Sequence, residues 1–187
     1  MKRILSAFSA FSFLVLQLAA APIAHAEKAD TLKPSNIEAD QFTLDDVKQI
    51  KTFTGNVILT RGTLLMKADK VVVTTDPAGY QFAVLYAAQT PNSFATFRQK
   101  RDGGPDLWID GQAADRIEYD DKTEIVKIYK NAQMRRLEGT KPTDVVNGEF
   151  ISYDSRAEFY SVNNTADGTS KPGAGRIKAV IQPKTKP

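Results

Sequence analysis

The chain contains no cysteine, and its only histidine among 187 residues is His25. Thiol nucleophiles, Ser-His-Asp triads and transition-metal sites with imidazole or thiolate ligands all need one of these two residue types. The sequence after His25 therefore excludes these kinds of catalysis and metal binding, and we expect neither a metal site nor a cofactor. Without cysteine, disulfides cannot contribute to stability either.

A Gly-rich loop with the Lys and Ser or Thr that would cradle a nucleotide phosphate is also missing. The remaining candidates for catalysis are two carboxylate pairs, Asp45-Asp46 and Asp120-Asp121. Both pairs end a segment of alternating apolar residues, where Asp is favoured because it accepts hydrogen bonds from the turn backbone. We therefore expect that the protein is not an enzyme. A periplasmic hydrolase that acts on envelope glycans through two carboxylates stays open as an alternative.

Long apolar runs are confined to the N-terminus. Lys2-Arg3 precedes an apolar run from Ile4 to Ala21, and Ala24-His25-Ala26 forms a small-x-small site. This arrangement is typical of a secretory signal peptide, so we expect residues 1–26 to be cleaved and the protein to lie in the periplasm. The net charge is only +3, with 25 basic and 22 acidic residues, and gives no argument for nucleic acid as a partner.

One short pattern occurs four times: a small residue and an acidic residue, then alternating apolar and polar residues closed by Asp or Thr. The copies cover residues 39–45, 68–74, 114–120 and 148–154. The period of two and the abundance of Val, Ile, Phe and Tyr predict strands. Unequal spacing between the copies indicates a degenerate repeat with loop insertions. Only the segment from Leu44 to Phe53 also fits a short helix, and there we favour a hairpin connection.

Basic residues cluster at Arg98-Gln99-Lys100-Arg101 and at Arg135-Arg136. Arginine binds phosphate well, so either cluster could meet an anionic ligand. The alternative is a solvated hairpin tip beside Gly103-Gly104. Trp108, the single tryptophan, is expected at a core or edge position.

The alternating apolar residues of the repeats and of the strands that follow them would lie on one side of a continuous trough. They are Phe42, Leu44, Val71, Val73, Ile117, Tyr119, Ile151 and Tyr153 in the repeats, and Phe53, Val57, Leu59, Val126, Ile128 and Met134 in the following strands. If two such sheets face each other without closing, burial of a 12-carbon acyl chain contributes on the order of 9 kcal/mol, at about 0.8 kcal/mol per methylene. The same residues could instead fill a packed sandwich core, and the pattern alone does not decide between the two.

Three segments resemble the OstA-like family of lipopolysaccharide-transport proteins: Ile37-Glu38-Ala39-Asp40, Phe53-Thr54-Gly55-Asn56-Val57, and the repeat copy at 68–74. The resemblance implies an all-β fold, an open and slightly twisted β-jellyroll of about 16 antiparallel strands built from degenerate repeats. We assign this domain to residues 27–165. Residues 166–187 would add a short terminal strand and a disordered tail rich in Lys and Pro.

The resemblance also implies a function, namely binding of lipopolysaccharide in a hydrophobic groove that shields the acyl chains of lipid A. Such proteins bridge the inner-membrane export complex and the outer-membrane translocon. In the groove, the resemblance places Ile37, Phe97 and Tyr119, together with Met66 and the trough residues named above.

Partners are implied at both ends of the sheet. The edge near Ile37 to Leu44 would meet an LptC-like protein anchored in the inner membrane. The other edge, around Phe159 to Val162 and Arg176 to Gln182, would meet an LptD-like translocon or a further copy in a head-to-tail homo-oligomer. One departure from the family is Tyr129-Lys130-Asn131, where a Gly usually precedes the Asn.

A structural adaptor with a packed core and no lipid cargo remains the alternative function. The two interpretations differ in what a charged residue at Phe97 or Tyr119 would do. A packed core predicts unfolding, whereas a groove predicts a folded protein with weakened ligand binding.

The hydrolase alternative is tested by changing one acidic residue of each pair to its amide, Asp46→Asn and Asp121→Asn. A carboxylate-dependent mechanism loses its acid or its base in each variant, so activity would fall by orders of magnitude. We expect instead that both variants leave the cell envelope unchanged, measured as resistance to detergent and to large antibiotics. An envelope defect in both variants at wild-type protein levels would argue for catalysis.

Overall fold

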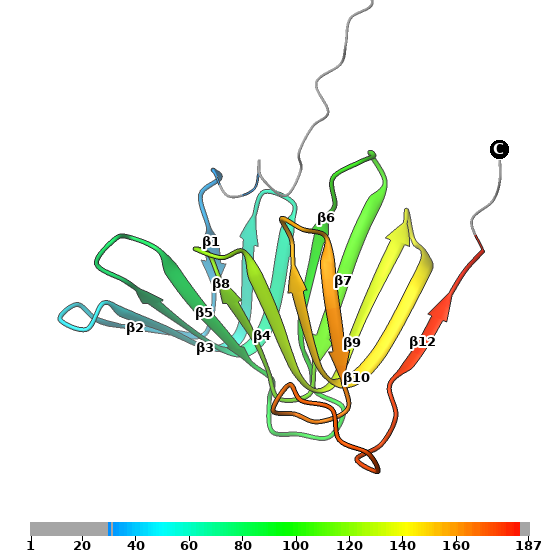
Figure 1. The fold of residues 1–187 in the computed structure, drawn as a ribbon. Helices are drawn as coiled ribbons and strands as arrows, with labels where there is room; N and C mark the ends of the chain where they lie inside the picture. Colours follow the sequence, from blue (N-terminus) through cyan, green and yellow to red (C-terminus); the bar gives the residue numbers. More distant parts are fainter. Residues whose placement is uncertain (1–29, 31, 184–187) are drawn as a thin grey trace, which may run out of the picture.

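The computed structural model describes residues 30 and 32–183, and its regular structure consists of strands (Figure 1). The predicted signal peptide and the last four residues of the predicted tail lie outside the described residues. All strands in the described part pair antiparallel within one 12-stranded sheet. The all-β prediction is therefore confirmed.

The strands differ greatly in length, and the four longest contain 12 to 14 residues each. In chain order the strands are β1 Asn36–Glu38, β2 Gln41–Asp45, β3 Ile50–Arg61, β4 Leu64–Thr75, β5 Gln81–Tyr86, β6 Ala95–Lys100, β7 Leu107–Ala113, β8 Arg116–Asp120, β9 Ile125–Glu138, β10 Lys141–Asp154, β11 Phe159–Asn163 and β12 Lys178–Ile181.

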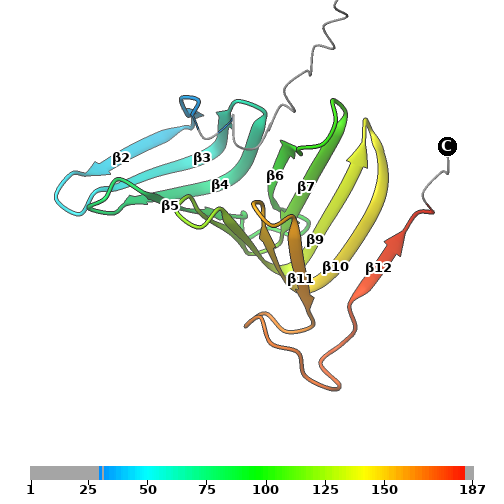
Figure 2. The same ribbon diagram turned by 45° about the horizontal axis from the view of Figure 1, so that its top comes forward.

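The sheet folds over itself into two layers, and β3, β4, β9 and β10 run through both. In one layer the order is β2-β3-β4-β5-β8-β9-β10-β11. In the other it is β1-β3-β4-β6-β7-β9-β10-β12. Figure 2 shows the curved long strands and the divergence of β2 and β3 from β7, β9 and β10, which gives the sheet an open, V-like outline.

Bulges allow the long strands to bend without breaking. The β3–β4 register shifts between Thr54 and Val57, where Gly55 and Asn56 have φ of 82° and 48°. The β9–β10 register shifts between Gly148 and Phe150, opposite Lys130 and Asn131, whose φ values are 65° and 47°. A bulge adds an unpaired residue and bends its strand. β9 thus forms this bend with Lys130 at the position where the resemblance implied a glycine.

These continuous bends explain the difference from the expected strand count. About sixteen strands were expected, and this number is not confirmed, because the described residues form twelve. If the two arms of each long strand are counted separately, sixteen arms result. Sequence patterns reveal each arm by its own alternation, but they do not show that two arms are continuous.

The core is built from rows of aligned side chains that cross each layer. The row of the first layer holds Phe42, Phe53, Val71, Leu85, Ile117, Ile128, Ile151 and Val162. The row of the second holds Ile37, Leu59, Met66, Phe97, Gly111, Met134, Val146 and Ala179. Interior members of both rows belong to one hydrophobic core, so the two layers pack face to face.

The aspartates that close the predicted strand segments accept hydrogen bonds in hairpin turns. Asp45 accepts from the amide of Lys48 at 3.0 Å, Asp120 from that of Lys122 at 2.9 Å and Asp154 from that of Arg156 at 3.0 Å. The expectation that these residues serve turns is confirmed. Leu44 to Phe53 likewise forms the β2–β3 hairpin and not a helix.

Replacement of Lys130 by glycine is expected to stabilise the protein. A non-glycine residue in the left-handed region costs roughly 1–2 kcal/mol, and glycine avoids most of that cost. We expect Lys130→Gly to raise the free energy of unfolding by about 0.5–1 kcal/mol, measured by urea denaturation. Lys127→Gly is the matched control, because Lys127 is also exposed on β9 but has no positive φ. Lys127→Gly should lower the free energy of unfolding by about 0.5–1 kcal/mol. If Lys130→Gly also lowered it by this amount, the left-handed conformation at Lys130 would not be strained.

Candidate functional site: a cavity between the two layers

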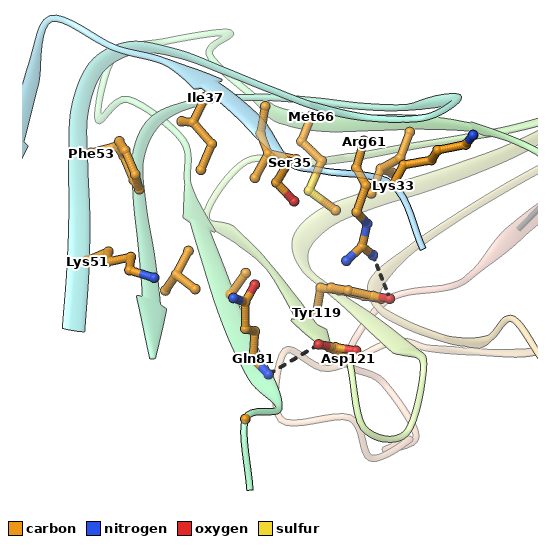
Figure 3. Close-up of a pocket in the computed structure, with 15 residues that line it drawn as sticks. Lys33, Ser35, Ile37, Lys51, Phe53, Arg61, Met66, Gln81, Tyr119 and Asp121 are labelled. Carbon is orange, nitrogen blue, oxygen red and sulfur yellow. Dashed lines mark hydrogen bonds between the residues drawn. The ribbon is translucent and has the colours of Figure 1, made fainter. Parts of the chain in front are cut away.

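A cavity of about 630 Å³ opens between the layers, in the part of the molecule formed by β1, β3, β4, β5 and β8 (Figure 3). Its floor is apolar and consists of Ile37, Phe53, Leu59, Leu64, Met66, Val73 and Ala83. Its rim is polar and includes Lys33, Ser35, Lys51, Arg61, Gln81, Tyr119 and Asp121. The cavity therefore suits a ligand with an apolar body and a polar head.

Strand alternation places the rim residues. Arg61 lies two residues beyond Leu59 on β3 and shares its inward face, while Lys51 lies two residues before Phe53 on the other arm of β3. Both side chains therefore start from the core side of their layer, close to the ends of their strands. A charged residue at such a position can reach the cavity without entering the packed interior.

Arg61 and Tyr119 contact each other across the gap between the layers. The Arg61 guanidinium donates a hydrogen bond from Nη2 to the Tyr119 hydroxyl at 3.1 Å, and its Cζ lies 5.5 Å from the ring centroid. Burial raises the pKa of Tyr119, and the positive charge of Arg61 opposes that shift. The phenol stays protonated at neutral pH and can accept this bond.

Farther along the sandwich, toward β11, further arginines close the gap. Arg101 follows β6 and pairs with Glu158 at 2.6 Å. Arg136 on β9 donates to the carbonyl oxygen of Glu158 at 3.1 Å, and its Cζ lies 5.0 Å from the ring centroid of Tyr160. The interior is thus open near β1 and held closed near β11.

The predicted groove residues fall into three sets. Six line the cavity: Ile37, Phe53, Leu59, Met66, Val73 and Tyr119. Nine others are buried in the packed core: Val57, Val71, Phe97, Ile117, Val126, Ile128, Met134, Ile151 and Tyr153. Phe42 and Leu44 lie on edge strand β2 with about half of their surface exposed, 53% and 51%. Contact of any of these residues with lipid stays a prediction.

Substitutions at Phe97 and at Tyr119 therefore test different properties of the protein. Phe97 is 3% exposed, and its ring covers Gly111 so closely that a Cβ there would lie 2.0 Å from a ring carbon. A charge at Phe97 would destabilise the fold whether or not the interior opens to lipid. Tyr119 is only partly buried at the cavity rim, so it is the position that distinguishes a groove from a filled core.

Of the polar rim, only Tyr119 was predicted as a groove residue, and Asp121 was considered only as a catalytic carboxylate. The other rim residues were not predicted: Lys33, Ser35, Lys51, Arg61 and Gln81. A signal existed for two of them. Lys51 and Arg61 continue the inward alternation of Phe53 and Leu59.

The basic clusters form contacts that the sequence did not predict. Arg98 and Arg135 both pair with Asp110, at 3.4 and 2.9 Å, and Arg98 stacks on Trp108 with its Cζ 4.6 Å from the ring centroid. Arg98 lies within β6 and Arg135 within β9, so neither residue belongs to a hairpin tip. The phosphate-binding interpretation of these clusters loses support, because their guanidinium groups are engaged within the protein.

The carboxylate pairs of the hydrolase alternative lie far apart. Asp45 and Asp120 occupy one register row, separated by four strand spacings through Ile50, Thr74 and Phe82. At about 4.8 Å per spacing this is about 19 Å, well beyond the roughly 5–9.5 Å between the two carboxylates of a glycosidase. Within the described residues, no group of three or more His, Cys, Asp or Glu could hold a metal ion, and no helix could span a membrane.

Known proteins are similar to this chain in sequence and in fold. The family described as "LptA/(LptD N-terminal domain) LPS transport protein" matches residues 36–159. The "Lipopolysaccharide export system protein LptA" of Haemophilus influenzae is 32% identical over 173 residues, covering 91% of this chain and 90% of that protein. The protein of the same name from Escherichia coli K12 is 37% identical over 137 residues, covering 73% and 68%.

A solved structure shows the same fold. It is LptH of Pseudomonas aeruginosa, the LptA-homologous periplasmic component of the lipopolysaccharide transport device of that organism. The TM-score is 0.68 at 24% identity, covering 82% of this chain and 99% of that one. The resemblance inferred from the sequence is thus confirmed for the family and for the fold.

The contacts that close the gap near β11 can be tested by Arg101→Gln. This change breaks the pair with Glu158, in which Arg101 is only 13% exposed, so we expect the free energy of unfolding to fall by about 1–2 kcal/mol. Amide exchange in β11 should become faster. Lys48→Gln is the control, because Lys48 pairs with Asp45 within one turn and is 71% exposed. It should change stability by less than about 0.5 kcal/mol. Equal effects of the two variants would mean that the Arg101 contact does not hold the layers together.

Proposed function

Because the chain belongs to the family of LptA and LptD N-terminal-domain lipopolysaccharide transport proteins, we propose that it binds lipopolysaccharide and carries it toward the outer membrane. The observation that supports this most directly is the cavity between the layers, with its apolar floor and polar rim. The acyl chains of lipid A would lie on the floor, and the sugars would stay outside the rim.

The driving force for binding is burial of acyl methylenes. Each contributes about 0.8 kcal/mol when it leaves water, so even part of one 12-carbon chain contributes several kcal/mol. Apolar floor residues such as Phe53, Leu59 and Met66 need no directional contacts with the chain. Lipid can therefore slide along the floor at little cost, as transport requires.

Energy for transport must come from another protein, since the chain has no phosphate-cradling loop. In the proposed mechanism an ATPase on the cytoplasmic side of the inner membrane pushes lipid along, and this protein supplies the path. The contacts of Arg101 and Arg136 with the β10–β11 turn would have to open for lipid to pass beyond the cavity toward β11.

The sheet offers an edge at each end for assembly. β1 and β2 pair with β3 and have no second neighbour among the described residues, and β11 and β12 stand in the same relation to β10. Unpaired strand edges recruit further strands. We propose an LptC-like inner-membrane protein at the β1 and β2 edge. An LptD-like translocon, or a second copy of the chain, would pair at the β11 and β12 edge.

Exposed apolar side chains support these edges as interfaces. Phe42 and Leu44 are exposed on β2, while Phe159 on β11 and Ile181 on β12 are 65% and 72% exposed. The signal-peptide pattern of residues 1–26 supports a periplasmic location, in which a bridge of this kind would lie.

A packed adaptor that links the same partners without binding lipid is the second candidate. The nine predicted groove residues that are buried in the core favour it. The two candidates agree on the edges and differ on whether lipid enters the space between the layers.

Photocrosslinking in cells distinguishes the two candidates. A photoreactive residue at Phe53 or at Tyr119 faces the cavity, and one at Lys127 is exposed on β9 away from it. We expect lipopolysaccharide adducts from the first two positions and none from Lys127. Adducts at the buried Phe97 would indicate that the interior opens during transport. Absence of adducts at both cavity positions, in a folded and exported protein, would favour the adaptor.

A further inference from the structure

Within the described residues, Arg61 is a buried cation without a carboxylate partner. Its side chain belongs to a residue that is 9% exposed, and Tyr119 accepts its hydrogen bond. Its Nε is buried and has no hydrogen-bond partner, and no ion pair involves Arg61 within the described part of the chain. A buried charge is costly unless it is paired and hydrogen-bonded. The position therefore suits an anion that arrives from outside.

Two further cations line the same cavity. Figure 3 shows Arg61 reaching toward Tyr119, with Lys33 beside Arg61 and Lys51 on the opposite side. Neither lysine forms an ion pair within the described residues. Three cations therefore line this one cavity.

The carboxylates nearby are engaged elsewhere. Asp121 lines the rim and accepts a hydrogen bond from the amide of Gln81 at 3.3 Å. Asp30 accepts from the amide and the hydroxyl of Thr63, at 2.8 and 2.6 Å, and from Gln99 at 3.1 Å. Three cations and one carboxylate line the cavity, so its rim has a net charge of +2.

We propose that Arg61, in a cavity that Lys33 and Lys51 also line, binds a phosphate group on the head of an acylated amphiphile whose chains lie on the apolar floor. This inference rests on the proposed function and identifies the part of the ligand that fixes its position. A phosphate monoester carries a charge of about −1.5 to −2 at neutral pH, which matches the rim. Adjacent guanidinium N–H groups suit two phosphate oxygens, and lysine stems can follow the head as it moves.

Arg61 could instead serve only to hold Tyr119 in place. The two roles differ in their effect on stability. A ligand-binding Arg61 is a burden to the unliganded protein, so Arg61→Met, which keeps the apolar stem, should leave the thermal midpoint unchanged or raise it. A structural Arg61 predicts a lower midpoint in Arg61→Met and a similar loss in Tyr119→Phe.

The decisive experiment measures binding of lipid A and of dephosphorylated lipid A to the purified chain, the wild type beside Arg61→Gln. We expect the wild type to bind the phosphorylated form at least tenfold more tightly, and Arg61→Gln to lose most of that preference while binding dephosphorylated lipid A as the wild type does. Lys67→Gln is the matched control, an exposed lysine on β4 outside this cavity, and should keep the preference.

Each other outcome leads to a distinct conclusion. Equal affinity of the wild type for both lipids, unaffected by Arg61→Gln, would overturn the phosphate site and leave the proposed function intact. Binding of neither lipid would overturn the proposed function itself. Inorganic phosphate that binds the wild type as tightly as lipid A does would indicate a site for free phosphate. If circular dichroism shows that Arg61→Gln is unfolded, Arg61→Lys and Lys51→Gln replace it, each with an expected loss of preference of a few fold.

Discussion

The structure depends on antiparallel pairing that continues through four bent strands. Because β3, β4, β9 and β10 keep their hydrogen-bonded neighbours on both sides of each bend, one sheet supplies both layers. Two of the bends contain residues in the left-handed region, Gly55 and Asn56 in β3 and Lys130 and Asn131 in β9. A folded sheet is joined through its own backbone and can leave part of the space between its layers open.

Charged side chains help to determine where the space between the layers is open and where it is closed. Arginines on one layer reach residues of the other, Arg61 to Tyr119 in the middle and Arg101 and Arg136 to the β10–β11 turn. The contact of Arg61 involves no carboxylate, whereas Arg101 has Glu158 as its partner. The same residue type therefore has different consequences at the two places: a paired arginine holds the layers closed, and an unpaired one leaves room for an anion.

Much of the fold follows from the sequence because its causes are local. Alternation with a period of two marks each strand arm, and Asp45, Asp120 and Asp154 mark the turns that end them. The bends are harder to predict, since Lys130 has no intrinsic preference for the left-handed region. It adopts this conformation because strand pairing before and after the bulge imposes it. Most of the apolar floor and Tyr119 of the rim were predicted. The inward positions of Lys51 and Arg61 follow from the alternation of β3, but the contact of Arg61 with Tyr119, 58 positions away, is not encoded by any local pattern.

Both layers end at the same two ends of the molecule, with β1 and β2 flanking β3 and with β11 and β12 flanking β10. A protein that continues the sheet there would pair with a strand edge in each of the two layers. Pairing at one edge alone would leave the neighbour free to rotate about that edge. Pairing in both layers would fix the orientation of the neighbour as well as its distance. Adjoining interiors would then stay in line, and the direction in which each mouth faces would be set by the backbone.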